Sequence, residues 1–361
     1  MFYRGKLMYK KKLLILLPIV LVIIILIYNC DRKNSFSHHL PSNHPLIKIQ
    51  DRLNQIINYS KEAVVKITGD KEIPTFFYTP QTDYRDWVIG TGFVFRKDEK
   101  YLYVLSNYHV IENSKKIKIT FLNNYQKEAI LVGKDRATDV AVLKVKLDDK
   151  LKKIKPLKIK TNVNLKEGDI ILVAGYPYNL DLSYSLGIVS ALHVNPGISE
   201  FEDFIQLNSA INPGNSGGPV FDIYGYVVGM VIATIQYGQG LGFAIPSDSI
   251  KYVSDEILIF GHVRRGWLGL LVENTADFIN ENGKGVLVIN VYKNSPAQRA
   301  GIKAGDIILA INGKYIKNRE DYKKMEARLR PNSTALLTII RNKKEVEISV
   351  KVSENKQDKN F

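Results

Sequence analysis

Between about residues 51 and 260, short apolar segments alternate with turns rich in Gly, Asn, Asp and Pro. Many of these segments carry Val, Ile, Tyr or Phe, the residue types that favour strands. A series of short strands separated by turn residues is typical of a β-sandwich or a β-barrel. A stretch of about 200 residues is long enough for two barrels, so we expect mainly β structure with a double β-barrel.

The predicted strands of this part are Val64–Thr68, Gly92–Phe95, Tyr101–Ser106, Lys116–Phe121, Val140–Lys146, Ile170–Ala174, Tyr184–Ala191, Phe204–Leu207, Val227–Thr234 and Gly242–Ala244. Two helices are expected in addition, Asp51–Ser60 and Ser247–Phe260. From about residue 261 the pattern changes to four strands around one helical stretch, Glu320–Leu329, which predicts a small α+β domain. The resulting domain prediction is 1–30, 31–50, 51–260, 261–353 and a polar tail, 354–361.

A candidate nucleophile lies in the glycine-rich segment Asn212-Pro213-Gly214-Asn215-Ser216-Gly217-Gly218-Pro219. A serine that cleaves an amide needs a base for its proton and donors for the developing oxyanion. The glycines permit a tight turn with unhindered backbone N–H groups. We therefore expect Ser216 as nucleophile and an oxyanion hole at Gly214, Asn215 and Ser216. Taken alone, the segment could also be an ordinary Gly/Asn turn.

Two further residues complete the chemistry. His109 follows a predicted strand in a context of small polar residues, and Asp139 opens an apolar strand. Separately, the histidine could be capped or buried, and the aspartate could cap a turn. Together with Ser216 they form a base, an orienting carboxylate and a nucleophile in the order His, Asp, Ser, which is the chymotrypsin-type order.

With this triad, the sequence resembles the HtrA family of trypsin-like serine proteases over most of residues 51–353. The matching segments beyond the triad are Gly90-Thr91-Gly92-Phe93-Val94, Ala174-Gly175-Tyr176-Pro177, Leu186-Gly187-Ile188-Val189-Ser190-Ala191, Ala210-Ile211-Asn212 and Gly242-Phe243-Ala244-Ile245-Pro246. The resemblance implies two β-barrels with the triad between them, and ATP-independent cleavage of misfolded or signalling proteins outside the cytoplasm. It also implies a trimeric assembly and no cofactor.

The C-terminal domain carries its own signature. Arg265-Gly266-Trp267-Leu268-Gly269-Leu270 resembles the carboxylate-binding loop of a PDZ domain, and Ser295-Pro296-Ala297 with Ala300 to Ile308 is a second match. Consecutive amides of such a loop capture a peptide carboxylate, while a strand edge takes the peptide. We expect Trp267, Leu268, Gly269 and Leu270 to bind peptide C-termini, although Trp267 alone could be a core aromatic.

One PDZ domain behind an anchored protease resembles the membrane-anchored stress-sensor branch of the family. That likeness implies that a C-terminal peptide at the PDZ domain rearranges the oxyanion loop. Two departures from the family pattern weaken this expectation of peptide-gated activation. Val194, or His193 with a shift of one residue, lies where the family has a relay arginine. Leu207-Asn208 replaces a Thr-Asp pair of the family.

The specificity pocket is expected at Ala210, Ile211, Val231 and Ala233, with Val231–Thr234 pairing with substrate as an added strand. Trypsin-like specificity needs a carboxylate near position 210, where this chain has Ala210. The pocket should therefore prefer a small apolar residue such as Val, Ala or Ile.

The N-terminus predicts a membrane anchor. Leu13 to Tyr28 is an uncharged run interrupted only by Pro18 and preceded by five basic residues, which favours a cytoplasmic N-terminus. As a helix the run covers roughly 24 Å, somewhat less than a hydrocarbon core of about 30 Å. A cleaved signal peptide is the alternative, but the run ends in bulky residues rather than in an A-x-A site. Either way the remainder faces outward, in the periplasm under the anchor hypothesis.

The remaining composition adds exclusions. The single cysteine, Cys30, allows no intrachain disulfide. We interpret the polar segment that contains His38, His39 and His44 as a tether rather than as a metal site. The net charge of +15 suits a lysine-rich solvated surface. A basic charge balance is also typical of nucleic-acid binders, but the motifs of such proteins are absent, so no nucleic-acid partner is expected. A noncatalytic chaperone or PDZ binding module on a degenerate barrel stays open beside the protease hypothesis.

Overall fold

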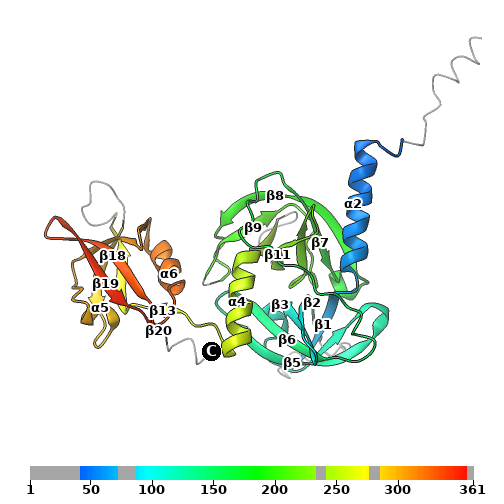
Figure 1. The fold of residues 1–361 in the computed structure, drawn as a ribbon, viewed down its shortest axis with the longest axis horizontal. Helices are drawn as coiled ribbons and strands as arrows, with labels where there is room; N and C mark the ends of the chain where they lie inside the picture. The colour runs from blue at the N-terminus through cyan, green and yellow to red at the C-terminus, as the bar shows by residue number, and fades with distance from the viewer. Residues whose placement is uncertain (1–40, 72–86, 200, 233–240, 276–284, 356–361) are drawn as a thin grey trace, which may run out of the picture. The chain divides into compact units, whose positions relative to one another are not determined.

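The computed structural model describes residues 41–71, 87–199, 201–232, 241–275 and 285–355 (Figure 1). The predicted anchor at Leu13–Tyr28 lies outside these ranges, as do the tail before it and the first half, 31–40, of the predicted linker 31–50. Among the described residues, the search for a helix of sufficient length and apolarity to span a bilayer found none. Contacts divide the chain into a unit of residues 1–54 and a unit of residues 55–361. Helix α2 (Pro45–Ser60) begins in the first and ends in the second.

Six strands of the larger unit close into a first barrel in the order β1-β2-β3-β6-β5-β4. Their bounds are β1 Val64–Lys71, β2 Trp87–Lys97, β3 Tyr101–Ser106, β4 Ser114–Thr120, β5 Gln126–Asp135 and β6 Val140–Lys146. The short helix α3 (Tyr108–Ile111) follows β3. Strand β6 is buried at five of its seven positions because it runs between two neighbours in the closed barrel.

A second barrel closes in the order β10-β11-β12-β9-β8-β7. Its strands are β7 Ile170–Gly175, β8 Ser183–Val194, β9 Phe204–Leu207, β10 Pro219–Asp222, β11 Val227–Ile232 and β12 Gly242–Pro246. The interior is filled by branched apolar side chains, among them Val173, Val220 and Val231. The predicted double barrel is therefore confirmed.

Helix α4 (Ser247–Phe260) packs against β5 and β6 of the first barrel and against β11 and β12 of the second (Figure 1). It ends at Gly261, whose left-handed conformation, φ 78°, lets its N–H bond to the Ile257 carbonyl. A left-handed glycine after the last turn is a common helix stop because other residues adopt this conformation with a steric cost.

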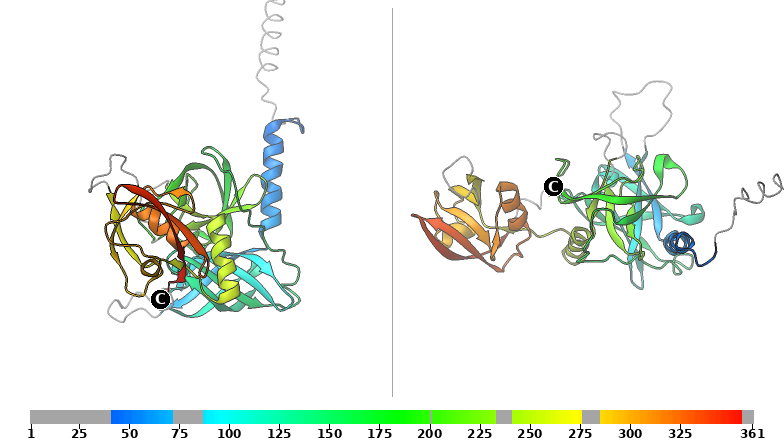
Figure 2. Two further views of the ribbon diagram at one scale, coloured as in Figure 1. Left: turned by 60° about the vertical axis from the view of Figure 1, so that its left-hand side comes forward. Right: turned by 90° about the horizontal axis from the view of Figure 1, so that it is seen from above.

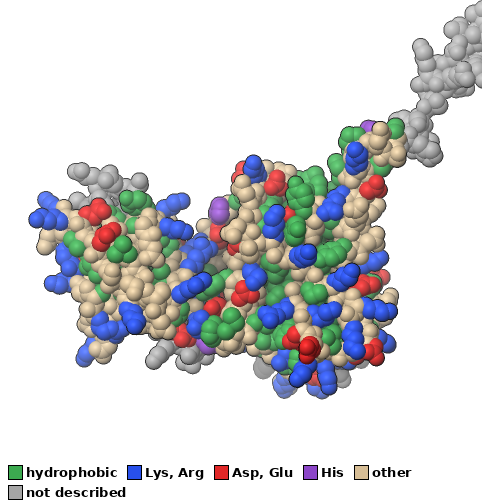
Figure 3. Space-filling model, viewed as in Figure 1, with side chains coloured by type: hydrophobic (Ala, Val, Ile, Leu, Met, Phe, Trp, Pro, Cys, Tyr) green, Lys and Arg blue, Asp and Glu red, His purple; other side chains and the backbone are tan. Residues whose placement is uncertain are grey.

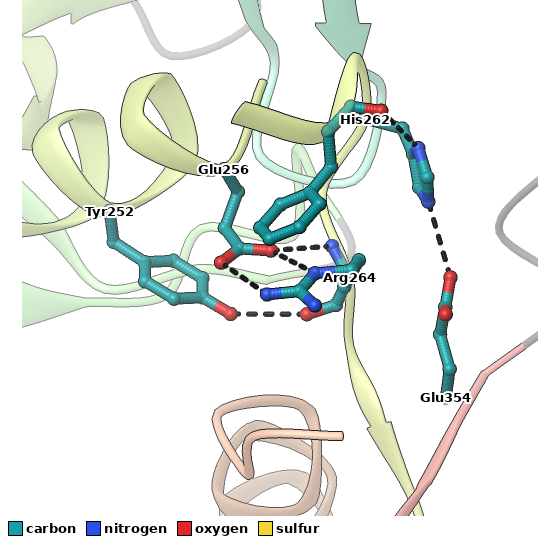
Figure 4. Close-up of polar contacts among 6 residues, drawn as sticks. Tyr252, Glu256, His262, Arg264 and Glu354 are labelled. Atoms are coloured by element: carbon teal, nitrogen blue, oxygen red, sulfur yellow. Dashed lines mark hydrogen bonds and ion pairs between the residues drawn. The ribbon is translucent and has the colours of Figure 1, made fainter. Parts of the chain in front are cut away.

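The segment that leaves α4 is fixed by polar contacts (Figure 4). The Arg264 guanidinium donates two hydrogen bonds to the Glu256 carboxylate, at 2.9 and 3.2 Å. The Tyr252 hydroxyl donates to the Arg264 carbonyl at 3.2 Å, and the His262 ring lies 3.2 Å from the Glu354 carboxylate. The paired fork of Arg264 and Glu256 holds the start of this segment on the helix.

Residues 266–354 form an α+β fold, drawn from yellow to red in Figures 1 and 2. The sheet follows the order β14-β15-β16-β18-β19, with β17 beside β16, while β13 pairs separately with β20. The bounds are β13 Gly266–Trp267, β14 Leu270–Asn274, β15 Val286–Val291, α5 Pro296–Arg299, β16 Ile307–Ile311, β17 Lys314–Tyr315, α6 Arg319–Ala327, β18 Thr334–Arg341, β19 Lys344–Lys351 and β20 Ser353–Glu354. Strand β14 is an edge of this sheet.

Basic side chains are dispersed on the face shown in Figure 3. Lysines and arginines lie there among acidic, apolar and other side chains. This distribution matches the solvated surface expected from the composition.

Candidate active site

The short helix α3 presents His109 beside Asp139. The imidazole Nδ1 lies 2.7 Å from Asp139 Oδ2, and the His109 backbone N–H donates to Asp139 Oδ1 at 2.9 Å. The carboxylate thus fixes both the ring and the backbone of the histidine. A proton held on Nδ1 by a carboxylate leaves Nε2 as the basic nitrogen. The His109 side chain is 40% exposed, so the ring remains accessible.

Asp139 is itself held in an uncommon conformation at the start of β6. Its φ is 57°, in the left-handed region, and the residue is buried. Its carbonyl accepts hydrogen bonds from the Asn107 side chain at 3.0 Å and from the Tyr108 N–H at 3.1 Å. These bonds tie the turn before β6 to the segment that carries His109, which offsets the local steric cost.

Ser216 lies in the loop between β9 and β10, in the second barrel, and is buried. Two hydrogen bonds from Thr91 join this loop to the first barrel. The Thr91 N–H donates to the Ser216 carbonyl at 2.8 Å, and the Thr91 hydroxyl donates to the Gly214 carbonyl at 2.6 Å. A Cβ built on Gly217 would lie 2.4 Å from Ser106 Oγ and 3.1 Å from Asn107 N. The loop therefore packs directly on the residues that precede His109.

Thr91 is a residue whose role the sequence did not reveal. It is fully buried in β2, and besides donating to Gly214 its Oγ1 accepts the Tyr176 N–H at 3.0 Å. Its carbonyl accepts the Ser106 hydroxyl at 2.7 Å. The sequence indicates Thr91 only as part of a glycine-rich strand, because a lone threonine between glycines gives no sign of its partners far away in the sequence.

The predicted oxyanion donors divide into two groups. Gly214 has φ 100°, and a Cβ built there would lie 2.3 Å from the Tyr176 carbonyl, so the position requires glycine. Within the described residues its N–H has no hydrogen-bond acceptor. The Asn215 N–H, in contrast, donates to the Asn212 carbonyl at 3.0 Å. The prediction of an oxyanion donor at Asn215 is therefore wrong, since its amide closes the turn.

The predicted specificity residues lie in different surroundings. Ala210 is exposed and Ile211 packs partly against the second core, whereas Ala233 lies outside the described residues. Val231 is fully buried, its carbonyl accepts the Gly217 N–H at 2.9 Å, and its N–H donates to Gly218 at 2.8 Å. Pairing of Val231 with substrate is thus contradicted, because the loop of Ser216 already occupies its backbone groups.

The two positions that depart from the family relay also have defined contacts. Val194 ends β8 and pairs with Phe204 of β9. His193, at φ 58°, places its Nδ1 2.7 Å from Asp203 Oδ1. An imidazole and a carboxylate therefore lie at this end of β8, near the position at which the family resemblance places a relay arginine.

A buried ion pair connects the residues before β13 with the segment of Asp139. Arg265 donates to Asp135 at 2.9 and 2.6 Å, and both side chains are 7% exposed. Asp135 also accepts the Thr138 N–H at 3.2 Å. Thr138 directly precedes Asp139. The Asp135 carboxylate therefore binds both the Arg265 side chain and the turn that contains Asp139.

Two carbonyls of the predicted peptide-binding loop accept hydrogen bonds from neighbouring segments of the same domain. The Leu268 carbonyl accepts the Ala297 N–H at 2.9 Å, and the Gly269 carbonyl accepts the Tyr292 N–H at 3.0 Å. Leu268 is fully buried, while Trp267 is partly exposed and its ring lies 6.2 Å from that of Tyr292. Leu270 opens the edge strand β14. In the described part of the chain, no cluster of His, Cys, Asp and Glu could hold a metal ion.

Comparison with known families identifies both folded parts. Residues 90–230 match the model of the trypsin-like peptidase domain, and residues 266–352 match that of the PDZ domain.

Curated relatives extend the match across most of the chain. A probable periplasmic serine endoprotease DegP-like of Chlamydia muridarum (strain MoPn / Nigg) is 35% identical over 291 residues, which are 78% of this chain and 57% of the relative. The protein of the same description from Brucella suis biovar 1 (strain 1330) is 35% identical over 278 residues, 75% of this chain and 53% of the relative. The chain thus spans little more than half the length of these relatives.

Solved structures match at nearly their full length. The structure described as HtrA-type protease AlgW with tripeptide has a TM-score of 0.70 and 30% identity, and the match covers 84% of this chain and 97% of that one. The serine endoprotease from Yersinia pestis has a TM-score of 0.62 and 30% identity with the same coverage.

Proposed function

Because the chain belongs to the HtrA family of serine proteases, we propose that it is a serine endopeptidase that uses Ser216, His109 and Asp139. In this proposal residues 51–260 are the protease domain and residues 261–353 the PDZ domain. The observation that carries it is the double contact of Asp139 with His109, through the ring at 2.7 Å and the backbone at 2.9 Å. That arrangement orients an imidazole for proton transfer.

The proposed mechanism uses these three residues in turn. Nε2 of His109 takes the proton of the Ser216 hydroxyl as this oxygen attacks the peptide carbonyl. The amides of Gly214 and Ser216 stabilise the negative oxygen of the tetrahedral intermediate. The imidazolium then returns its proton to the leaving amine, and a water molecule hydrolyses the acyl-enzyme by the same route. Acidification lowers the rate, because a protonated imidazole cannot accept the serine proton.

The substrates we propose are unfolded or membrane-associated proteins outside the cytoplasm, in protein quality control or regulated envelope proteolysis. The names of the curated relatives support the compartment, since they describe periplasmic endoproteases. The proposal includes a single-pass anchor in the inner membrane and a homotrimer, which rest on the N-terminal sequence and on the family. The proposal also includes a preference for a small apolar residue before the cleaved bond, which rests on Ala210 in place of a carboxylate.

We also propose that C-terminal peptides bound by the PDZ domain modulate cleavage. Peptides are present in the AlgW structures that this chain resembles. The ion pair of Arg265 with Asp135, and the bond from Thr138 to Asp135, supply a physical connection toward Asp139. A conformational change at Arg265 would therefore act on the turn that holds His109.

Cleavage of an unfolded casein-like protein tests the nucleophile. We expect Ser216→Ala to lower kcat by about 10⁴-fold or more, because removal of a triad member abolishes the concerted proton transfer. Ser209→Ala is the matched control, since Ser209 is a buried serine of the same loop. Unchanged cleavage by Ser216→Ala would remove Ser216 from the mechanism, whereas retained binding of casein without cleavage would support it.

A further inference from the structure

The peptide-binding loop of the PDZ domain already holds a carboxylate from its own chain. Glu326, in the last turn of α6, accepts the Leu268 N–H at 2.7 Å through Oε1. The next amide of the loop, that of Gly269, also lowers the pKa of this carboxyl. Both amides belong to the loop Trp267–Leu270 that the sequence predicts to capture a peptide carboxylate.

The geometry of the loop explains why an anion binds there. Gly269 has φ 81°, and a Cβ at this position would lie 2.2 Å from the Ser295 Cβ, so a glycine is required. A left-handed residue in such a loop turns neighbouring N–H groups toward one point, which creates an anion-binding concavity. Because the carbonyls of Leu268 and Gly269 are already bonded to Ala297 and Tyr292, the loop cannot easily turn its amides elsewhere.

The surroundings of Glu326 make its charge costly. Burial raises the pKa of this carboxyl to about 7, against the lowering effect of the loop amides, of Tyr322 and of Lys323. Tyr322, one helical turn earlier, is fully buried, and burial together with the Glu326 charge raises the pKa of its phenol well above the usual value. The cation nearest along the loop, Arg265, is bonded to Asp135. The ionised form of Glu326 therefore depends on the loop amides, together with Tyr322 and Lys323, for its stabilisation.

We propose that Glu326 sets the peptide affinity of the PDZ domain by competing with the C-terminal carboxylate of a bound peptide for the amides of Leu268 and Gly269. The inference rests on the proposed peptide binding and adds the residue that opposes it. The partner is an extended peptide with a free C-terminus that pairs with the edge of β14. Two carboxylates cannot share these two amides without strong mutual repulsion, so Glu326 must withdraw or become neutral before the peptide binds.

The competition gives peptide binding a defined pH dependence. Between pH 6 and pH 8 the peptide carboxylate stays ionised, since terminal carboxyls titrate near pH 3–4. Glu326 is mostly protonated at pH 6 and mostly ionised at pH 8. If only the protonated form is competent, the apparent Kd is the intrinsic Kd divided by the protonated fraction, which weakens binding about tenfold from pH 6 to pH 8.

Fluorescence anisotropy measures the Kd of peptide binding as a function of pH. The protein is the full chain with Ser216→Ala, which prevents cleavage of the peptide. The probe is a labelled pool of decapeptides that end in Val, Leu, Ile or Phe with a free carboxylate, and a matched pool that ends in an amide. Glu326→Met removes the competing acceptor, and Glu326→Gln keeps an acceptor without an ionisable group. Glu320→Gln is the control, because Glu320 is exposed in the first turn of the same helix.

We expect the parent chain and Glu320→Gln to bind the carboxylate pool about tenfold more weakly at pH 8 than at pH 6. Glu326→Gln should show no such dependence, and Glu326→Met should bind at pH 8 at least about tenfold more tightly than the parent. Glu326→Met should bind the carboxylate pool but not the amide pool. The titration of the parent chain tests the inference even if a variant folds poorly.

Equal and pH-independent Kd values for the parent and both Glu326 variants would overturn the inference while leaving peptide binding intact. Equal affinity of Glu326→Met for the amide and carboxylate pools would also overturn it, because the loop would then not receive the carboxylate. Absence of binding in every variant would remove both the inference and the proposed role of the PDZ domain. The cleavage proposal is tested separately with casein and would be unaffected.

Discussion

At the scale of single residues, the candidate active site depends on backbone geometry as much as on the triad. Gly214 and Gly217 both have positive φ, and a side chain on either would collide with a carbonyl of a neighbouring segment, Tyr176 or Thr91. The Ser216 loop is therefore shaped by contacts at which only glycine fits. The triad residue types identify the chemistry, but these contacts decide where the nucleophile lies.

Gly214→Ala tests this dependence. The new Cβ would lie 2.3 Å from the Tyr176 carbonyl, so the loop must shift and the oxyanion donor moves with it. We expect kcat to fall about 10²- to 10³-fold, the usual effect of losing one oxyanion donor. Gly168→Ala is the control, because Gly168 has a similar φ, 90°, and open space around it. Equal activity of the two variants would contradict the proposed role of Gly214.

At the scale of elements, strands with several apolar residues were easier to predict than strands of mixed pattern. β3, β6 and β9 begin and end where the sequence predicts, as does helix α4. β5 was not predicted because its apolar residues, 129–132, form one consecutive run in which Ile130 and Leu131 are exposed, so no alternation marks the strand. β10, only four residues long, was missed because it begins at Pro219, directly after a glycine-rich loop. Pairing across the barrels defines both strands.

Helix α6 offers a prediction at this scale. Asn318 Oδ1 accepts the Asp321 N–H at 2.8 Å, and Asp321 Oδ2 accepts the Lys317 N–H at 3.0 Å, so the first turn is capped reciprocally. We expect Asn318→Ala to destabilise the helix by about 1 kcal/mol. Hydrogen exchange of the α6 amides should then accelerate about fivefold.

The matched variant Asn318→Asp keeps a side-chain acceptor at the cap and should leave the exchange rates near those of the parent. Similar acceleration in both variants would show that the cap does not limit opening of α6. Cleavage of casein without an added C-terminal peptide should be unchanged by either substitution, because neither alters the triad or the Ser216 loop.

At the scale of the whole molecule, a single buried ion pair joins sequence positions that are 130 residues apart. The Arg265 guanidinium also lies 4.8 Å from the Phe201 ring, and the Phe201 N–H donates to the Ala137 carbonyl at 3.1 Å. The residues around Asp135 are thus contacted both by the segment before β13 and by the loop after β8. No sequence pattern marked this network.

Asp135→Asn should be strongly destabilising, because it leaves the buried Arg265 charge without its partner. We expect the free energy of unfolding to fall by about 3–5 kcal/mol, measured by urea denaturation. The double variant Asp135→Leu with Arg265→Met should cost less than Asp135→Asn alone, since it removes both charges. A larger cost for the double variant would show that the pair stabilises by packing rather than by charge compensation.

By itself, the sequence determined the residue types of the triad, the double barrel, the PDZ fold and the family, because these depend on local motifs and on the spacing of apolar segments. The tertiary structure decided which backbone and side-chain groups are already engaged in hydrogen bonds and which remain available to bind a substrate or a peptide. It assigned the amide of Asn215 to a turn and the backbone of Val231 to the Ser216 loop, and it placed the Glu326 carboxylate on the peptide-binding loop. Each of these outcomes is a hydrogen bond whose partner is fixed only when the chain has folded, so no reading of neighbouring residues could have found it.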